Sequence, residues 1–366
     1  MQTRSLIESL AHQAEFEMVR FGQVGETPRF DAFTLWLRQG FHGTMAYMER
    51  GKKTRASPLV RLPTAKTAVV LAMSHGSKRP ADPGGNTGKV ACYAWGRDYH
   101  NLMGKRLRKL QRALRERGID SWGGVDTAPI VERAWAAATG LGFPGKNCAQ
   151  IIPGTTSWLL LAVLFVDVSI PGDAPLQDHC RKCRRCLDAC PSQAFVAPRN
   201  LDSRRCISYW TIEVAELPPR QLRPLIGRWV FGCDRCQEVC PHNGGATPPG
   251  HGDLQPRHAW LDLEEILRCP DDELMERFRG TPLRRPKAAG LKRNALLVLA
   301  NIGDKNCIPT VRLALDHSSP LVRGAAVWAL SRLGDPLAWT HDDEDELVLA
   351  EVKAARQAKD GLSSPD

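Results

Sequence analysis

The spacing of the cysteines constrains what this chain can fold into more than any other feature. Twelve of the 366 residues are cysteines, and four of them form a C-x2-C-x2-C-x3-C-P run, Cys180, Cys183, Cys186 and Cys190 before Pro191. In bacterial ferredoxins this spacing lets three thiolates bind three corners of one 4Fe-4S cubane, while the fourth ligates a second cluster. The run therefore predicts two clusters and a second group of ligands elsewhere in the chain.

A shorter run supplies most of that second group. Its cysteines are Cys233, Cys236 and Cys240, followed by Pro241, but Val230 stands where a full run has its first cysteine. Cys206 lies between the two runs and brings the number of ligands to eight. Crossing the fourth cysteines predicts one cluster on Cys180, Cys183, Cys186 and Cys240, and the other on Cys190, Cys206, Cys233 and Cys236.

Zinc is the alternative metal, because C-x2-C pairs also build four-cysteine zinc sites. The triple spacing followed by C-P is unusual for zinc and natural for cubanes, which favours iron and sulfide. The remaining cysteines are scattered along the chain, and we expect them to be ordinary buried thiols. They are Cys92, Cys148, Cys269 and Cys307.

Length and composition indicate a globular protein of two or three domains, at about 150 residues per domain. Hydrophobic residues make up 43% of the chain and charged residues 25%, and no apolar run reaches the ~20 residues of a membrane-spanning helix. The N-terminus has neither an apolar signal core nor a twin-arginine pair, so we expect a cytoplasmic protein without a membrane partner. The net charge of +10 suits a nucleic-acid partner, although many basic proteins bind none.

The first of three predicted segments, residues 1–175, indicates an α/β domain. Apolar runs at 68–73 and 159–166 predict buried strands. Between them a helix is expected to bury the apolar stripe Met103, Leu107, Leu110 and Leu114. Its interleaved basic residues, Arg106 among them, are expected on solvated faces.

The other two segments are a ferredoxin-like domain and a helical domain. Residues 176–250 carry the cluster cysteines and end in a Gly- and Pro-rich loop at 241–251. Residues 251–366 contain a repeat in which 323–335 resembles 292–304, and both copies end in Gly-Asp. This pattern predicts HEAT-like helical repeats that end in glycine turns, followed by a polar tail that frays from about residue 355.

Two stretches in the first segment resemble known binding motifs but do not predict those binding sites. The glycines at 140–145 follow an expected helix at 130–139 instead of a strand, so they predict neither a dinucleotide fold nor a P-loop. The stretch from Asp98 through His100 to Gly104 resembles the D-x-H-x-x-G motif of some cobalamin proteins but is one residue too long. We therefore do not assign His100 as a cobalt ligand.

Several stretches together resemble the epoxyqueuosine reductase family of tRNA-modifying enzymes. They are 43–48 with Arg50, 125–129 with Glu132 and Arg133, 140–142 with 145–147, the ferredoxin run, 206–213, 232–237 and 291–295. Including the second helical repeat, the resemblance spans residues 43–335. A doubled ferredoxin site fused to helical repeats is a rare combination, which makes the resemblance specific.

The resemblance implies an oxidoreductase that removes the epoxide oxygen of epoxyqueuosine at the wobble position of tRNA, giving queuosine. It implies a base-off cobalamin in the N-terminal α/β domain, reduced through the two clusters. The matched motifs place cofactor contacts on Arg50, Lys146, Asn147, Ser208, Tyr209, Cys233, Asp234, Arg235 and Cys236. Cys148 stands where a small hydroxyl residue is expected, so the pocket wall can differ there.

The resemblance also assigns Asp126 as the proton donor for epoxide opening. A carboxylic acid suits this step if a pocket shielded from water raises its pKa toward neutral. The alternative is structural: Asp is a favoured N-cap, so Asp126 could cap a helix that begins near Thr127, with Pro129 in the first turn.

The expected partners are tRNA and an external electron donor, and we expect a monomer. The tRNA is predicted to lie across the ferredoxin-like segment and the repeats, with phosphates on Arg284, Arg285, Lys287, Lys292 and Arg293. A merely solvated helix end is the alternative for this basic set.

Three other functions stay open at this point. They are an electron carrier whose helical segment docks a protein, a nucleic-acid-binding protein with structural clusters, and another cobalamin-dependent reductase. Reductive dehalogenases share cobalamin and two clusters, but they usually carry a twin-arginine signal and no HEAT repeats. Clusters without cobalamin would favour the carrier, and clusters that dithionite cannot reduce would favour the nucleic-acid-binding protein.

Overall fold

The computed structural model describes residues 2–244 and 251–362. Its contacts group the chain into two compact units, each built from several segments. Unit 1 contains Met1–Lys78, Gly96–Arg204 and Asp234–Gln255, and unit 2 contains Arg79–Trp95, Arg205–Cys233 and Pro256–Asp366.

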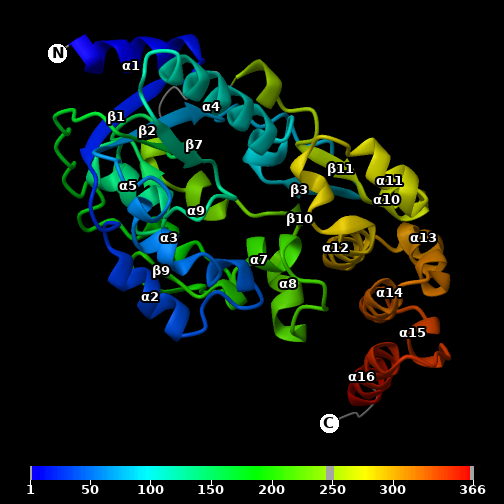
Figure 1. Cartoon of the computed structure of the whole chain (residues 1–366). Coiled ribbons are helices and arrows are strands. Elements are labelled where there is room, and N and C mark those ends of the chain that lie inside the picture. The colour runs from blue at the N-terminus through cyan, green and yellow to red at the C-terminus, as the bar shows by residue number, and fades with distance from the viewer. Residues whose placement is uncertain (1, 245–250, 363–366) are drawn as a thin grey trace. The chain divides into compact units, whose positions relative to one another are not determined.

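Unit 1 is built on a four-stranded antiparallel sheet with the strand order β1-β2-β7-β4 (Figure 1). The strands are β1 Met18–Gln23, β2 Thr67–Ser74, β7 Leu159–Val166 and β4 Ser121–Gly124. The predicted strands at 68–73 and 159–166 are confirmed as the two central strands, which pair with Val70 opposite Val163. Every residue of β2 is buried, which explains its continuous apolar sequence.

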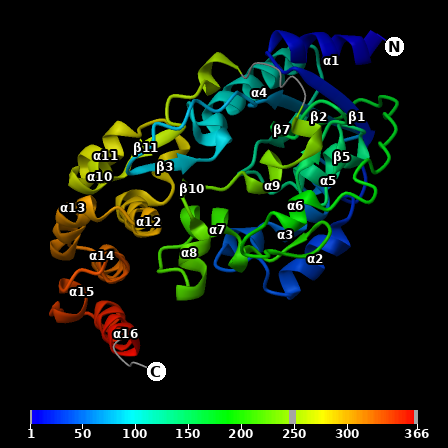
Figure 2. The same ribbon diagram turned by 180° about the vertical axis from the view of Figure 1, so that it is seen from behind.

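Among the helices that precede the cysteine segment in unit 1, α1, α4 and α5 make the main contacts with this sheet. These helices are α1 Gln2–Gln13, α2 Phe30–Arg38, α3 Lys52–Ala56, α4 Tyr99–Arg115 and α5 Glu132–Ala138. Both views show α1 lying beside α4 (Figures 1 and 2). The short elements of unit 1 are β5 Phe143–Pro144, β6 Gln150–Ile151, α6 Arg185–Asp188, β8 Phe195–Ala197, β9 Asn200–Leu201 and α9 Arg235–Glu238.

Helix α4 buries the predicted apolar stripe, Met103, Leu107, Leu110 and Leu114. The expectation for Arg106 is wrong, because this side chain lies inside the unit instead of on a solvated face. It is 5% exposed, and its guanidinium pairs with the Glu15 carboxylate at 2.7 Å and donates to the Glu15 carbonyl at 2.9 Å. A charge at this depth needs such partners.

The glycine stretch after α5 acts as a helix stop, as predicted. Gly140 has φ +68°, and a Cβ there would lie 2.2 Å from the carbonyl oxygen of Ala174. Only glycine fits this left-handed position under the neighbouring chain. The context excludes a dinucleotide fingerprint, which has to open a helix.

Unit 2 combines a small sheet with a row of helices. Its sheet has the order β10-β3-β11, formed by Trp229–Phe231, Thr87–Val90 and Trp260–Asp262. Its helices are α7 Ile207–Ile212, α8 Arg223–Ile226, α10 Leu263–Arg268, α11 Asp271–Arg277, α12 Lys287–Ile302, α13 Ile308–Leu313, α14 Pro320–Leu333, α15 Leu337–Thr340 and α16 Glu346–Leu362. Helices α12, α14 and α16 lie side by side in both views (Figures 1 and 2).

The repeated sequence forms α12 and α14, and both end in the predicted glycine turns. Gly303 and Gly334 have φ of 78° and 79°, and each caps its helix in the left-handed conformation. The predicted frayed tail is wrong up to Leu362, because α16 continues through it. Val348, Val352 and Ala355 lie one helical turn apart and are buried, which holds this helix in place. Residues 363–366 of the predicted tail lie outside the described residues.

The cysteine segment does not form a compact unit of its own. Residues 176–204 pack into unit 1 and residues 205–233 into unit 2, while 234–244 return to unit 1. The contiguous boundaries 1–175, 176–250 and 251–366 stay a prediction, and part of the predicted loop at 241–251 lies outside the described residues. Among the described helices, none combines the length and the apolar character needed to cross a bilayer.

Candidate functional site

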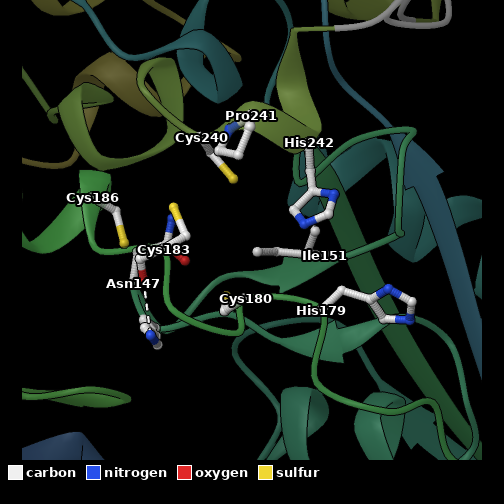
Figure 3. Close-up of a pocket in the computed structure, with 10 residues that line it drawn as sticks. Asn147, Ile151, His179, Cys180, Cys183, Cys186, Cys240, Pro241 and His242 are labelled. Carbon is white, nitrogen blue, oxygen red and sulfur yellow. Dashed lines mark hydrogen bonds between the residues drawn. The ribbon is translucent and has the colours of Figure 1, made fainter.

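The first predicted set of cysteines surrounds a cavity in unit 1. Its walls are formed by Cys180, Cys183, Cys186, Cys240, Lys146, Asn147, Ile151, His179, Pro241 and His242. Figure 3 shows the sulfur atoms of Cys183 and Cys240 turned toward the space between them. The structure thus brings the three close cysteines of one run together with the last cysteine of the other.

Two side chains outside the runs fix the loops around this cavity. The Lys146 ammonium donates to the carbonyl oxygens of Arg181 and Cys183 at 2.6 and 2.8 Å. The Asn147 amide donates to the carbonyl oxygen of Cys236 at 3.1 Å. Both side chains were predicted as cofactor contacts, and here their polar atoms hold the backbone of the cysteine loops.

The four thiols form one group of interacting side chains. Burial, together with the neighbouring charges of Cys180, Cys240 and Cys183, raises the pKa of Cys186 to about 11, so the four groups lie close enough to interact. Across residues 2–244 and 251–362, no three His, Cys, Asp or Glu side chains are arranged to hold one metal ion. Four thiolates can bind a single zinc ion at about 2.3 Å, or they can each bind one of the four irons of a 4Fe-4S cubane.

The second predicted set draws on both units. Cys190 and Cys236 belong to unit 1, and Cys206 and Cys233 belong to unit 2. In unit 1 the Cys190 sulfur accepts the backbone N–H of Ala194 at 3.4 Å. In unit 2, Cys206 is the N-cap residue of α7. Within each unit the backbone that carries these ligands is ordered by regular structure, while their grouping around one cluster stays a prediction.

Asp126 lies on the turn between β4 and α5 and has φ +46°. The alternative that it caps a helix is wrong, because α5 begins at Glu132 and its N-cap residue is Val131. The Asp126 carboxylate instead contacts two side chains of α4. Its Oδ2 atom accepts the Tyr99 hydroxyl at 3.0 Å and lies 2.6 Å from Nε2 of His100.

His100 is held between two carboxylates. Its second ring nitrogen, Nδ1, lies 2.7 Å from Oδ1 of Asp98, which also accepts the His100 backbone N–H at the start of α4. Sequence reasoning gave His100 no role. The Asp-x-His spacing at a helix start was a usable signal, but nothing in the sequence indicates that Asp126 meets it from 26 residues away.

The pKa values of Asp126 and His100 decide which of the two side chains carries the proton. Burial alone would raise the pKa of Asp126, but the hydrogen bond and the charge of His100, with the Tyr99 hydroxyl, lower it below its usual range. Burial would likewise lower the pKa of His100, yet Asp126 and Asp98 raise it to about 9. The condition stated for Asp126 as an acid, a pKa raised toward neutral, is therefore not met in this arrangement, and the pKa of His100 places the proton on the imidazole.

Glu132 completes the group from the first turn of α5. Its Oε1 atom accepts the backbone N–H of Asp126 at 2.6 Å, which fixes the turn. Burial of the carboxyl group, and then the negative charge of Asp126, raises the pKa of Glu132 to about 8. At neutral pH the two neighbouring carboxyl groups thus differ: Asp126 is ionised and Glu132 is protonated.

The predicted cofactor contacts also divide between the units. Arg50, Lys146, Asn147, Asp234, Arg235 and Cys236 belong to unit 1, and Ser208, Tyr209 and Cys233 belong to unit 2. Arg50 and Arg235 are exposed, whereas Asp234 and Tyr209 are buried. Cys148 is partly exposed with φ +64°, and its carbonyl oxygen accepts from Arg133 at 2.7 Å.

Comparisons with known proteins give the family. Residues 55–127 match the family model described as "Epoxyqueuosine reductase QueG, DUF1730", residues 179–243 match a 4Fe-4S double cluster binding domain, and residues 283–355 match HEAT repeats. The epoxyqueuosine reductase of Pseudomonas aeruginosa is 41% identical over 314 residues, which cover 82% of this chain and 86% of that protein. The chain belongs to the epoxyqueuosine reductase family. The Xanthomonas campestris enzyme is 36% identical over 342 residues, covering 90% of this chain and 95% of that protein.

Solved structures of epoxyqueuosine reductases share the fold. A crystal structure of an epoxyqueuosine reductase with an epoxyqueuosine-modified tRNA stem loop matches with a TM-score of 0.91 and 28% identity, covering 97% of this chain and 98% of that one. The Bacillus subtilis enzyme, described with a catalytic aspartate loop swung out of its active site, matches with a TM-score of 0.86 and 28% identity. It covers 97% of this chain and 99% of its own.

The structure divides the basic residues that we predicted as tRNA contacts in this epoxyqueuosine reductase family member. Arg284, Arg285 and Lys287 are exposed, and Arg285 pairs with Glu213 at 2.9 Å. The prediction is wrong for the other two, because α12 is buried on almost all sides. Lys292 is 5% exposed and pairs with Asp271 at 2.7 Å. Arg293 is fully buried and donates to main-chain carbonyl groups.

Proposed function

We propose that this chain reduces epoxyqueuosine to queuosine at the wobble position of tRNA. Membership of the epoxyqueuosine reductase family supports the reaction, and the related structure that contains an epoxyqueuosine-modified tRNA stem loop supports the substrate. The observation that carries the proposal is the position of Asp126, an ionised carboxylate hydrogen-bonded to a protonated histidine in the same unit as the first cysteine set. We also propose that the protein acts in the cytoplasm, which a reaction on tRNA supports, and that it acts as a monomer.

The chemistry needs electrons and protons from different parts of the protein. Removing an epoxide oxygen as water, with a carbon–carbon double bond left behind, takes two electrons and two protons. We propose that an external donor supplies the electrons, which pass through one cluster on Cys180, Cys183, Cys186 and Cys240 and another on Cys190, Cys206, Cys233 and Cys236. The match of residues 179–243 to a double cluster binding domain supports this pair.

Cobalamin is the group that, when bound, would supply the two-electron chemistry at the carbon–oxygen bond. The state of His100 fits a cobalamin without a histidine ligand, because both of its ring nitrogens are engaged by Asp98 and Asp126. We propose Arg50, Asp234 and Arg235 among its contacts, together with Lys146, Asn147, Ser208, Tyr209, Cys233 and Cys236.

Asp126 is the residue that we propose to deliver the proton to the departing oxygen. Its side chain is 53% exposed, so a substrate can reach the carboxylate from outside. The Glu132 carboxyl group and the Tyr99 hydroxyl fix its position from two other sides. Proton transfer by a positioned side chain contributes ~100-fold or more to a rate.

The test is Asp126→Asn, which keeps the size and the accepting oxygen but cannot transfer a carboxylic proton. In a bacterial strain that lacks its own epoxyqueuosine reductase, the wild-type chain should restore queuosine in tRNA. The variant should hold both clusters and turn over at least ~100-fold more slowly. Asp120→Asn, an exposed change at the far end of β4, is the matched control and should behave as wild type. Near-normal turnover by Asp126→Asn would remove Asp126 from the mechanism.

A further inference from the structure

We propose that His100 is the positioning residue that keeps Asp126 supplied with its proton. The imidazolium of His100 passes the Nε2 proton to Asp126, which passes it to the oxygen leaving the epoxide. This relay rests on the proposed function and goes beyond it, because it names the source of the proton.

The geometry aligns a donor chain across three residues. Asp98, at the start of α4, engages Nδ1 of His100 at 2.7 Å and so fixes the ring with Nε2 directed at Asp126, 2.6 Å away. The Tyr99 ring stacks on His100 with centroids 4.1 Å apart. A histidine oriented by one carboxylate and bonded to another through its second nitrogen is arranged for proton transfer in one direction.

The charged groups around His100 explain why its imidazole ring is protonated at neutral pH. Asp98 and Asp126 face it directly, and the Glu132 carboxyl group and the Arg133 guanidinium act on Asp126 from α5. Arg55 of α3 also acts on Asp126 and Glu132. The net result is a pKa of about 9 for His100 and a lowered pKa for Asp126. At neutral pH, Asp126 therefore has no proton of its own to give.

The transfer balances without any further reactant. The Nε2–H bond of His100 breaks as an O–H bond forms on Asp126, and that bond breaks as the O–H bond of the product forms. His100 is left neutral, and it regains a proton from water because its side chain is 29% exposed. The relay moves no electrons.

The first test follows the proton without turnover. In the cluster-bearing protein with isotope-labelled histidine, NMR should show His100 titrating near 9. In Asp126→Asn and in Asp98→Asn the midpoint should fall toward the ordinary value of about 6.5, because each variant removes one carboxylate. Wild-type titration near the ordinary value would overturn the relay.

The second test uses the pH profile of turnover. His100→Gln keeps a hydrogen-bond donor for Asp126 but cannot pass on a proton, so kcat should fall about 100-fold while KM for tRNA stays unchanged. We expect wild-type activity to fall above pH 9, where His100 loses its proton, and this fall should disappear in the variant. His12→Gln, on α1, is the control and should retain the wild-type profile. An unchanged profile in His100→Gln would overturn the relay alone, whereas wild-type protein with both clusters and no turnover would overturn the proposed function.

A second, independent observation concerns the loop between Cys180 and Cys186. Four of its five residues are exposed cations, Arg181, Lys182, Arg184 and Arg185. The loop carries Cys183 and adjoins the cavity of the first cysteine set. The geometry points to this basic loop as the docking surface for an acidic one-electron carrier protein.

The position of the basic loop favours an electron carrier over tRNA. Electron transfer weakens steeply with distance, so the carrier has to dock close to a cluster. The cations of the basic loop are the sequence neighbours of the predicted ligands Cys183 and Cys186. Redox encounters use small interfaces and depend on opposite charges for their rate. Nearby acidic groups compensate little: Arg184 and Asp188 pair at 3.5 Å, and both are more than 60% exposed.

The test compares two charge reversals of equal size. The first is Lys182→Glu with Arg185→Glu in the loop, and the control is Arg112→Glu with Arg115→Glu on α4. A reduced acidic 2Fe-2S ferredoxin should reduce the clusters of the loop variant at least ~10-fold more slowly at low salt, with no such effect in the control. Reduction by dithionite should be equal in all three proteins. If the loop variant loses iron, Lys182→Gln with Arg185→Gln replaces it.

Two results would overturn this docking surface. One is equal slowing in the loop and α4 variants, which would indicate a general effect of net charge. The other is weaker tRNA binding by the loop variant with an unchanged rate of reduction by ferredoxin, which would make the basic loop a tRNA contact.

Discussion

Replacing Arg293 with Ala should unfold unit 2 at lower temperature instead of removing a tRNA contact. The guanidinium donates to the carbonyl oxygens of Trp210 at 2.7 Å and Val214 at 2.9 Å, and also to that of Glu216. Burial lowers the pKa of Arg293 to about 10, as expected for a cation held only by neutral groups. Without it, three main-chain acceptors lose their partner: the hydrogen bond to Val214 is buried, and those to Trp210 and Glu216 are partly buried.

The magnitude follows from these contacts. A buried acceptor left unsatisfied costs about 1–3 kcal/mol and a partly buried one costs less, so the variant should lose roughly 4 kcal/mol of stability. For a unit of about 150 residues this lowers the melting temperature by on the order of 10 °C. Arg293→Lys should lose almost as much, because one ammonium cannot reach all three carbonyl groups.

The assay is thermal unfolding followed by circular dichroism under anaerobic conditions. It is paired with tRNA binding measured well below the transition. Normal melting of Arg293→Ala, combined with weaker tRNA binding and a flatter salt dependence, would refute the structural role and restore the predicted phosphate contact.

Three other perturbations have defined outcomes. Replacing Arg284, Arg285 and Lys287 together with Ala should weaken tRNA binding and flatten the dependence of affinity on salt, at unchanged stability. An unchanged salt dependence would remove these three residues from the tRNA interface. Cys206→Ala should lose about half of the iron and sulfide and keep one cluster, whereas loss of all iron or of none would contradict the ligand assignment. The stability that His100 contributes should be fully present below its unfolded pKa near 6.5 and should be lost as the pH rises through about 9. Denaturant unfolding measures this as the difference in free energy of unfolding between wild type and His100→Gln. The difference should shrink by roughly 1 kcal/mol between these pH values, after allowance for the exposure of Asp126. A difference that does not change with pH would argue against the ion pair.

The features that the sequence predicts correctly are those set by local spacing. Strands β2 and β7 follow from continuous apolar runs, and the ends of α12 and α14 follow from glycines that alone tolerate the left-handed turn. The ferredoxin run likewise matches a double cluster binding domain.

The features that it misses depend on contacts between distant segments. Arg293 is buried because it binds carbonyl groups some 80 residues earlier in the chain. The sequence does not reveal these contacts, so Arg293 was predicted to be part of a basic surface. The lowered pKa of Asp126 was not predicted, because nothing in the sequence placed His100 beside it. The division of the contacts of residues 176–244 between two units is likewise hidden by the sequence order.

The most direct measurement is conversion of the modified nucleoside itself. Anaerobically purified protein with both clusters is incubated with cobalamin, a reductant and tRNA that carries epoxyqueuosine, and the digested nucleosides are analysed by mass spectrometry. We predict that epoxyqueuosine disappears and that queuosine, one oxygen lighter, appears in equal amount, only when cobalamin is present. Unchanged epoxyqueuosine in protein that holds two reduced clusters and cobalamin would contradict the account.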